Sequence, residues 1–182
     1  TKFNQLFDVA TTFGFTGNDL TVTGAGANDV GTTMTVTNAG TFTLDEGSTL
    51  TVGTFNQNGA GSNVIGDDIT ADVAGITFAR QVTLTSGTAS DTIVFTGAAG
   101  AGDDITLNTV LNADNENLRL VAGAAGDITS NAINLGVTGD LTITSAVDAT
   151  FNGAVTVENF SQAAGSGTTA FNQLFDVETA FG

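Results

Sequence analysis

The chain has 182 residues, and its 19 Asp and Glu residues against three Lys and Arg residues give a formal net charge of −16 at pH 7. Three scattered cations cannot form the basic patch that phosphate binding requires, and an anionic bilayer repels so acidic a chain, which excludes nucleic acid and membrane surfaces as partners. The sequence has no run of about 18 apolar residues, so we expect no membrane insertion. Disorder is also excluded, because hydrophobic residues make up 41% of the chain and charged residues only 12%.

Residues 1–14 (TKFNQLFDVATTFG) open the chain and return as residues 169–182 (TAFNQLFDVETAFG), with 11 of 14 positions identical. This match predicts that residues 1–168 form one long repeat and residues 169–182 the start of the next. The alternative is a pair of end caps, but the caps of a solenoid differ from its interior and from each other. We therefore expect either a covalent tandem array or a filament in which each copy continues the previous one.

Short strands are predicted along the whole chain, because apolar residues alternate with Thr at a period of two. Such alternation is typical of strands with one buried face, and Thr on the other face keeps the β-propensity high. Residues 108–117 fit this pattern least and are predicted to form a loop. The apolar pairs are, in chain order, Leu20/Val22, Met34/Val36, Phe42/Leu44, Leu50/Val52, Val82/Leu84, Ile105/Leu107, Leu118/Leu120, Leu141/Ile143 and Val155/Val157.

A shorter motif, Gly-Asx-Asp-(Ile/Leu)-Thr, precedes several of these strands. It occurs at residues 17–21, 66–70 and 102–106, and contracted copies occur at residues 126–129 and 139–142. The gaps between its Asp residues predict a strand-plus-turn unit of about a dozen residues, with two or three such units in a full coil. Gly, Asn, Asp and Ser between the strands are typical of turns.

A segment that returns almost unchanged favours a structure that grows by translation over a closed sandwich or barrel. The sequence therefore predicts an all-β fold, a right-handed parallel β-helix (β-solenoid) that forms part of a tandem or stacked fibre. Coils stacked at about 4.8 Å would align equal residues into ladders, with Phe in the core and Asn at the turns. The residues predicted to form these ladders and the contacts between repeats are Phe3, Asn4, Phe7, Phe151, Asn152, Phe171, Asn172 and Phe175.

Three stretches resemble a known class of protein. They are residues 19–29 (DLTVTGAGAND), 127–146 (DITSNAINLGVTGDLTITSA) and 153–173 (GAVTVENFSQAAGSGTTAFNQ). They look like the Thr/Gly/Ala/Asn-rich β-helix repeats of large bacterial surface proteins, the filamentous-haemagglutinin-like and autotransporter-like adhesins. The resemblance is one of composition and rhythm, covers essentially the whole chain, and includes no catalytic or binding signature.

This resemblance implies secretion to the bacterial cell surface and a role as a structural subunit of an extracellular filament, matrix or fibrous adhesin. The expected partners are further copies of the same chain, arranged head to tail or in covalent tandem. The alternative is an adhesin module that binds cell-surface glycans or a receptor.

Paired carboxylates are the first chemical candidates, because some polysaccharide-cleaving enzymes use β-helices. Glycosidases need two carboxyl groups that face each other across a bond. Adjacent residues of a strand, such as Asp67 and Asp68 or Asp103 and Asp104, point to opposite faces instead. We therefore expect no enzyme and no catalytic residues.

Calcium is the stronger chemical option, because oxygen ligands at stacked turns suit this ion. The candidate ligands are Asp19, Asp67, Asp68, Asp103 and Asp104. The sequence lacks the tandem Gly-Gly-x-Gly-x-Asp nonapeptide of RTX-type proteins. We expect no cofactor except calcium held loosely by the acidic surface. Outward Thr-x-Thr pairs are also typical of ice-binding solenoids, but their uneven spacing favours solvated strand faces.

Overall fold

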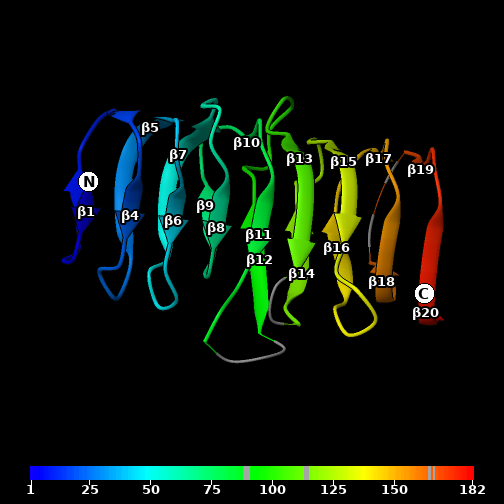
Figure 1. The fold of residues 1–182 in the computed structure, drawn as a ribbon. Helices are drawn as coiled ribbons and strands as arrows, with labels where there is room; N and C mark the ends of the chain where they lie inside the picture. Colours follow the sequence, from blue (N-terminus) through cyan, green and yellow to red (C-terminus); the bar gives the residue numbers. More distant parts are fainter. Residues whose placement is uncertain (88–90, 113–114, 164, 166) are drawn as a thin grey trace.

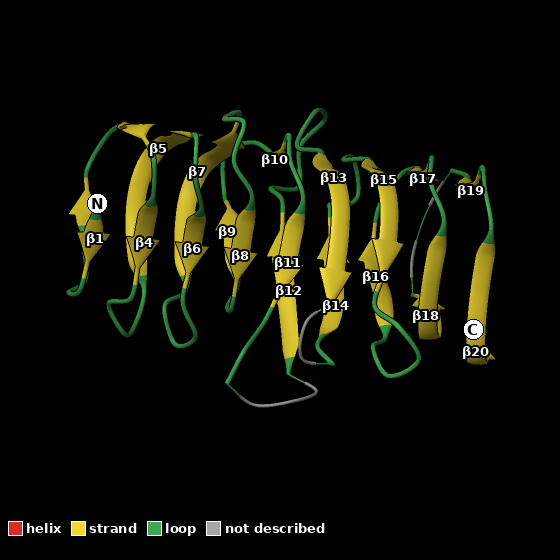
Figure 2. Ribbon diagram, in the orientation of Figure 1, coloured by secondary structure: helices red, strands yellow, loops and turns green. Residues whose placement is uncertain are grey.

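The computed structural model describes residues 1–87, 91–112, 115–163, 165 and 167–182. In these residues the secondary structure consists of 20 β-strands joined by turns, without a helix (Figure 2). The strands wind into about eight coils, stacked along one axis with the two termini at opposite ends (Figure 1). Within the described residues, all strand pairings between neighbouring coils are parallel. The predicted parallel β-helix is confirmed.

Strands on the same side of the stack form three parallel sheets, named A, B and C in the order in which each coil crosses them. Sheet A contains β1 (Lys2–Phe3), β4 (Leu20–Val22), β6 (Phe42–Leu44), β8 (Asn63–Ile65) and β11 (Val82–Leu84). Sheet B contains β2 (Asp8–Val9), β9 (Ile69–Ala71), β12 (Thr92–Thr96), β14 (Asn117–Val121) and β16 (Leu141–Ser145). Sheet C contains β3 (Phe13–Gly17), β10 (Ile76–Phe78), β17 (Ala149–Phe151) and β19 (Thr169–Phe171).

Six longer strands bend around a corner of the stack, so that each contributes to two sheets. Sheets B and C share β5 (Asn28–Asn38) and β7 (Leu50–Gln57). Sheets C and A share β13 (Ile105–Asn112) and β15 (Ile128–Asn134). Sheets A and B share β18 (Val155–Gln162) and β20 (Phe175–Phe181).

The predicted dozen-residue unit is wrong, because each coil has three sides and most of these sides are shorter than a dozen residues. The length of a coil also varies along the stack. In the first coils Lys2 pairs with Thr21, whereas further along the stack Ile76 pairs with Ile105. The Gly-Asx-Asp motif misled the count because it starts strands on all three sheets. Its first three copies lead into β4 of sheet A, β9 of sheet B and β13 of sheet C. The gaps between copies therefore count corners of the stack and not whole coils.

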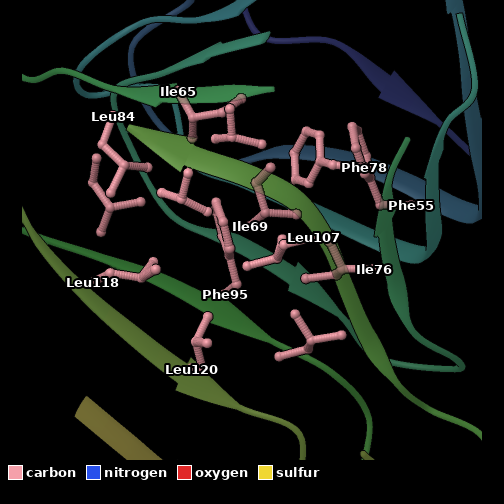
Figure 3. Packing of buried hydrophobic residues seen from close by; sticks show 14 of the residues in the cluster. Phe55, Ile65, Ile69, Ile76, Phe78, Leu84, Phe95, Leu107, Leu118 and Leu120 are labelled. Atoms are coloured by element: carbon pink, nitrogen blue, oxygen red, sulfur yellow. The ribbon is translucent and has the colours of Figure 1, made fainter. Parts of the chain in front are cut away.

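The alternating apolar residues fill the space between the three sheets, and all nine predicted pairs are buried there. The rings of Phe42, Phe55, Phe78 and Phe95 follow one another through three coils, with centroids 5.6, 4.9 and 5.6 Å apart. Figure 3 shows Phe55, Phe78 and Phe95 in one interior, with Ile and Leu side chains around them. Each such side chain contributes about 1.5–3 kcal/mol when buried. The buried residues of all coils form one cluster, so the core is continuous along the axis.

The loop predicted for residues 108–117 is wrong in its first half. Strand β13 continues to Asn112, because Val110 occupies an inward position of sheet A between Val82 and Ile133 of the neighbouring coils. Residues 113–114 lie outside the described part of the chain. Strand β14 begins at Asn117.

Candidate functional site

The first copy of the 14-residue motif forms an aromatic cluster in the first coil. Phe3 stacks on Phe7 with ring centroids 4.9 Å apart, and Phe13 lies 5.8 Å from Phe3 and 5.6 Å from Phe7. The three rings are partly buried against the core, because the second coil covers them. Alternation within the motif places Phe3, Val9 and Phe13 on the inward side of three successive sheets.

The second copy also forms an aromatic cluster, in the last coil. Phe171 stacks on Phe175 with ring centroids 3.8 Å apart, and Phe181 lies 5.6 Å from Phe175. Phe160 of the preceding coil lies between 5.4 and 5.5 Å from all three rings. Unlike Phe13, Phe181 is 69% exposed. An apolar cavity of about 520 Å³ lies against this coil, lined among others by these four rings.

The two copies lie on different sheets. Phe3 belongs to sheet A, where it pairs with Val22, whereas Phe171 belongs to sheet C, where it pairs with Phe151. The offset between the copies therefore does not correspond to a whole number of coils. Each copy of the motif crosses three successive sheets, but the sheet on which the copy starts depends on the residues between the copies.

A ladder of Phe and Asn crosses the last two coils of sheet C. The ring of Phe171 stacks on that of Phe151 at 5.0 Å with an interplanar angle of 9°. One residue on, Asn172 Nδ2 donates a hydrogen bond of 3.0 Å to Asn152 Oδ1. Asn4, in the first copy of the motif, accepts a hydrogen bond from Thr23 Oγ1 instead. Identical residues thus stack on each other where two Phe-Asn pairs occupy partner positions on neighbouring strands.

The structure does not bring the five calcium candidates together. Asp19 lies at the corner between sheets C and A, Asp67 and Asp68 between A and B, and Asp103 and Asp104 between B and C. Each carboxylate accepts a backbone N–H of a corner or strand, from Thr41, Asp68, Val94, Gly100 and Asp127 in that order. Among the described residues, no three His, Cys, Asp or Glu side chains are grouped closely enough to hold a metal ion.

The acidic residues at one A–B corner line a surface groove of about 330 Å³. Glu46, Asp67, Asp68 and Asp91 contribute carboxylates to it. Burial raises the pKa of Asp68 above its ordinary 3.8, and the charge of Asp67 adds to this effect. The hydrogen bond from Val94 N–H and the charge of Arg119 oppose it. Ionisation of Asp68 is therefore less favourable in the folded state than in the unfolded chain.

Replacing Asp68 by Asn should make the free energy of unfolding less dependent on pH above about pH 4. A raised pKa means that the folded chain keeps the Asp68 proton longer than the unfolded chain, so stability falls as the pH rises through this range. Asn keeps an oxygen for Val94 N–H and removes the charge. Chemical denaturation from pH 4 to pH 7 measures the slope. Asp45→Asn, at an exposed position, is the control with the same change in net charge. Equal slopes in both variants would contradict this assignment.

Buried amide side chains form hydrogen bonds at the corners, and the motifs found in the sequence do not include them. Gln57 Nε2 donates to Asn38 Oδ1 at 2.8 Å, and Asn38 Nδ2 donates to the carbonyl oxygens of Gly40 and Ser62. Asn63 Nδ2 donates to Gln81 O on the next coil. A signal was available, because Asn38, Gln57 and Asn63 occupy inward positions of alternating strands where an apolar residue is expected.

Sheet C also carries a regular polar stripe on its outer face. Thr77, Thr106, Thr129 and Thr150 are in register on four successive coils. Two residues before three of these threonines lie Asp104, Asp127 and Asp148, each of which accepts a backbone N–H from the following coil. Two residues after them lie Asn108, Asn131 and Asn152. We call these columns the Asp-Thr-Asn stripe.

In the described residues no helix is both long enough and apolar enough to cross a membrane. Comparison with protein-family models, with curated proteins and with solved structures gave no match in any of the three.

Proposed function

We propose that this chain is a structural repeat of an extracellular bacterial filament or fibrous surface adhesin, in which copies follow one another along the axis of the β-solenoid. The observation that carries the proposal is the 14-residue motif. It opens the chain and recurs from Thr169 to Gly182, and in both copies the middle one of its three Phe rings contacts the other two. Covalent tandem copies and separate head-to-tail subunits both fit this role.

Several physical properties support a fibre. Parallel coils add by translation along the axis, so the architecture has no intrinsic length. The core is continuous along the axis, and the Phe-Asn ladder of β17 and β19 is a contact that a further copy of the motif can extend. The net charge of −16 keeps neighbouring fibres apart. Divalent cations held loosely by the acidic surface would reduce that repulsion. We propose no catalytic role for the chain.

Electron microscopy of the purified chain tests this proposal, because axial association gives rods longer than the roughly 40 Å that eight coils occupy. A denaturing gel of the native material distinguishes the two forms of fibre. A single small band indicates separate subunits, and a very large band indicates one covalent array. Globular particles without an axial repeat at all concentrations would contradict the proposal.

Replacing Phe181 by Lys should shorten or abolish the rods. The equivalent residue, Phe13, packs against Met34 of the coil that covers it, and a charged side chain at this place resists burial. Light scattering and micrographs measure the rod length. The matched control is Val137→Lys, because Val137 is also largely exposed (61%, against 69% for Phe181) but lies in a corner away from the last coil. Equal shortening in both variants would contradict an end-to-end contact through Phe181.

The second candidate is a glycan-binding adhesin module, and the Asp-Thr-Asn stripe favours it. The stripe offers carboxylate, hydroxyl and amide groups in columns with a spacing of about 4.8 Å. Such groups can hydrogen-bond the hydroxyls of an extended sugar chain. A glycan array probed with the chain tests this function, and binding that persists after Thr106 and Thr129 are both replaced by Val would exclude the stripe as the binding face.

A further inference from the structure

We infer that successive copies of the repeat are joined with a rotation of one third of a turn, so that sheet C of one copy continues as sheet A of the next. This inference rests on the proposed fibre and specifies the contact between its copies. It follows from where the structure places three equivalent residue pairs of the 14-residue motif.

All three pairs shift by one sheet in the same direction. Phe3 lies on sheet A and Phe171 on sheet C. Val9 lies on sheet B, and its equivalent Val177 lies on sheet A beside Val157. Phe13 lies on sheet C, and its equivalent Phe181 lies on sheet B. All parts of the motif are therefore turned by the same amount around the axis.

The corners of the stack set the size of this rotation. From Phe3 the pairings of sheet A lead through seven neighbouring coils to β18, and the chain then crosses sheet B before it reaches Phe171 in sheet C. One repeat thus spans seven and two-thirds turns. Since each sheet is one side of a three-sided coil, the repeat falls one side short of eight whole turns.

The first two coils supply the register of the joint. There, Thr21 N–H donates to Thr1 O and Thr23 N–H to Phe3 O, both at 2.9 Å. At sheet B, Asp29 N–H donates to Phe7 O at 3.0 Å. The motif keeps the same backbone acceptors at Thr169, Phe171 and Phe175 in its second copy. The next repeat is expected to donate to them from its own Thr21, Thr23 and Asp29.

The same register fills the apolar cavity at the last coil. Val22, Val30 and Met34 are fully buried where they cover the first copy of the motif. In the next repeat these residues would lie over Phe171, Val177 and Phe181. The exposed ring of Phe181 would then become partly buried, as Phe13 is.

A two-copy chain, in which residues 15–182 follow Gly182, tests the rotation by disulfide formation. The chain has no native Cys. Lys2 and Thr21 are outward-facing partners in sheet A, so the rotated joint predicts that Ala170 faces Thr21 of the second copy. Partner residues on adjacent strands lie about 4.8 Å apart, within the range that a disulfide spans. Ala170→Cys with Thr21→Cys in the second copy should oxidise completely, with loss of both free thiols.

The control pair Lys2→Cys and Thr21→Cys within the first copy has the same local geometry and should oxidise equally. A joint without rotation would place Asp176 of sheet A opposite Thr21 of the second copy. Oxidation of Asp176→Cys with that Thr21→Cys, and not of the Ala170 pair, would overturn the rotation while leaving the fibre intact. Two separate particles in micrographs of the Cys-free two-copy chain, in place of one rod of double length, would overturn the fibre itself.

Discussion

Replacing Phe55 by Ala should lower the free energy of unfolding by about 3–5 kcal/mol. Phe55 is fully buried at the centre of the aromatic stack, with the rings of Phe42 and Phe78 at 5.6 and 4.9 Å. The substitution removes the transfer free energy of the ring and leaves a cavity that stacked coils cannot close by moving independently. Urea denaturation followed by far-ultraviolet circular dichroism measures the loss.

Phe181→Ala provides the matched control for this prediction. The same ring is removed, but Phe181 is largely exposed in the last coil, so the loss should be about 1 kcal/mol or less in the single-copy chain. In the two-copy chain the same substitution should cost more, because the following repeat covers the ring. Equal losses for Phe55 and Phe181 in the single-copy chain would contradict the burial described for the core.

Replacing Gly61 by Ala should destabilise the chain by more than the 1–3 kcal/mol or so typical of overpacking. A Cβ at this position would collide with the backbone carbonyl oxygen of Gly40 and lie 2.8 Å from Asn38 Nδ2. This corner is fixed by amide hydrogen bonds, since Gln57 Nε2 donates to Asn38 Oδ1 and to the carbonyl oxygens of Gly59 and Gly61. The backbone therefore cannot retreat without breaking buried hydrogen bonds.

Gly14→Ala is the control for the steric effect. A Cβ at Gly14 meets no atom within 4 Å, and the residue has no left-handed conformation. The substitution should therefore be neutral, or stabilise the chain by about 0.4–1 kcal/mol through the reduced entropy of the unfolded state. Thermal denaturation compares the two variants, and a folded Gly61→Ala variant with unchanged stability would contradict the close approach of the two coils at this corner.

The strands and the class of fold could be predicted from the sequence because both depend on local patterns. Alternation at pairs such as Leu20/Val22 determines which face of each strand is buried, and the confirmed pairs show that tertiary contacts did not override it. The length of a coil could not be predicted in this way. The Gly-Asx-Asp motif reports only that a strand starts, and the same turn chemistry serves all three corners.

The candidate site was less accessible from the sequence. The repeated motif was visible, and so were the Phe and Asn residues within it, because near-identity over so long a segment needs no structure to detect. The sheet on which each copy lies depends on corners of unequal length, so it could not be read from the offset between the copies. The inward positions of Asn38 and Gln57 could be recognised in the alternating strands, but their hydrogen bonds to each other and to Ser62 could not be predicted, because these bonds join neighbouring coils.

Hydrogen bonds between the coils run along the axis of the stack, and this direction has a mechanical consequence for a fibre that joins two surfaces. A pull on the ends loads the coils one after another, so they peel away singly. Each coil that peels converts about 4.8 Å of rod into roughly 70 Å of extended chain for about 20 residues. Such a tether would lengthen under a sudden load, limiting the force on its anchor points, and would shorten as each coil rewound onto the intact core.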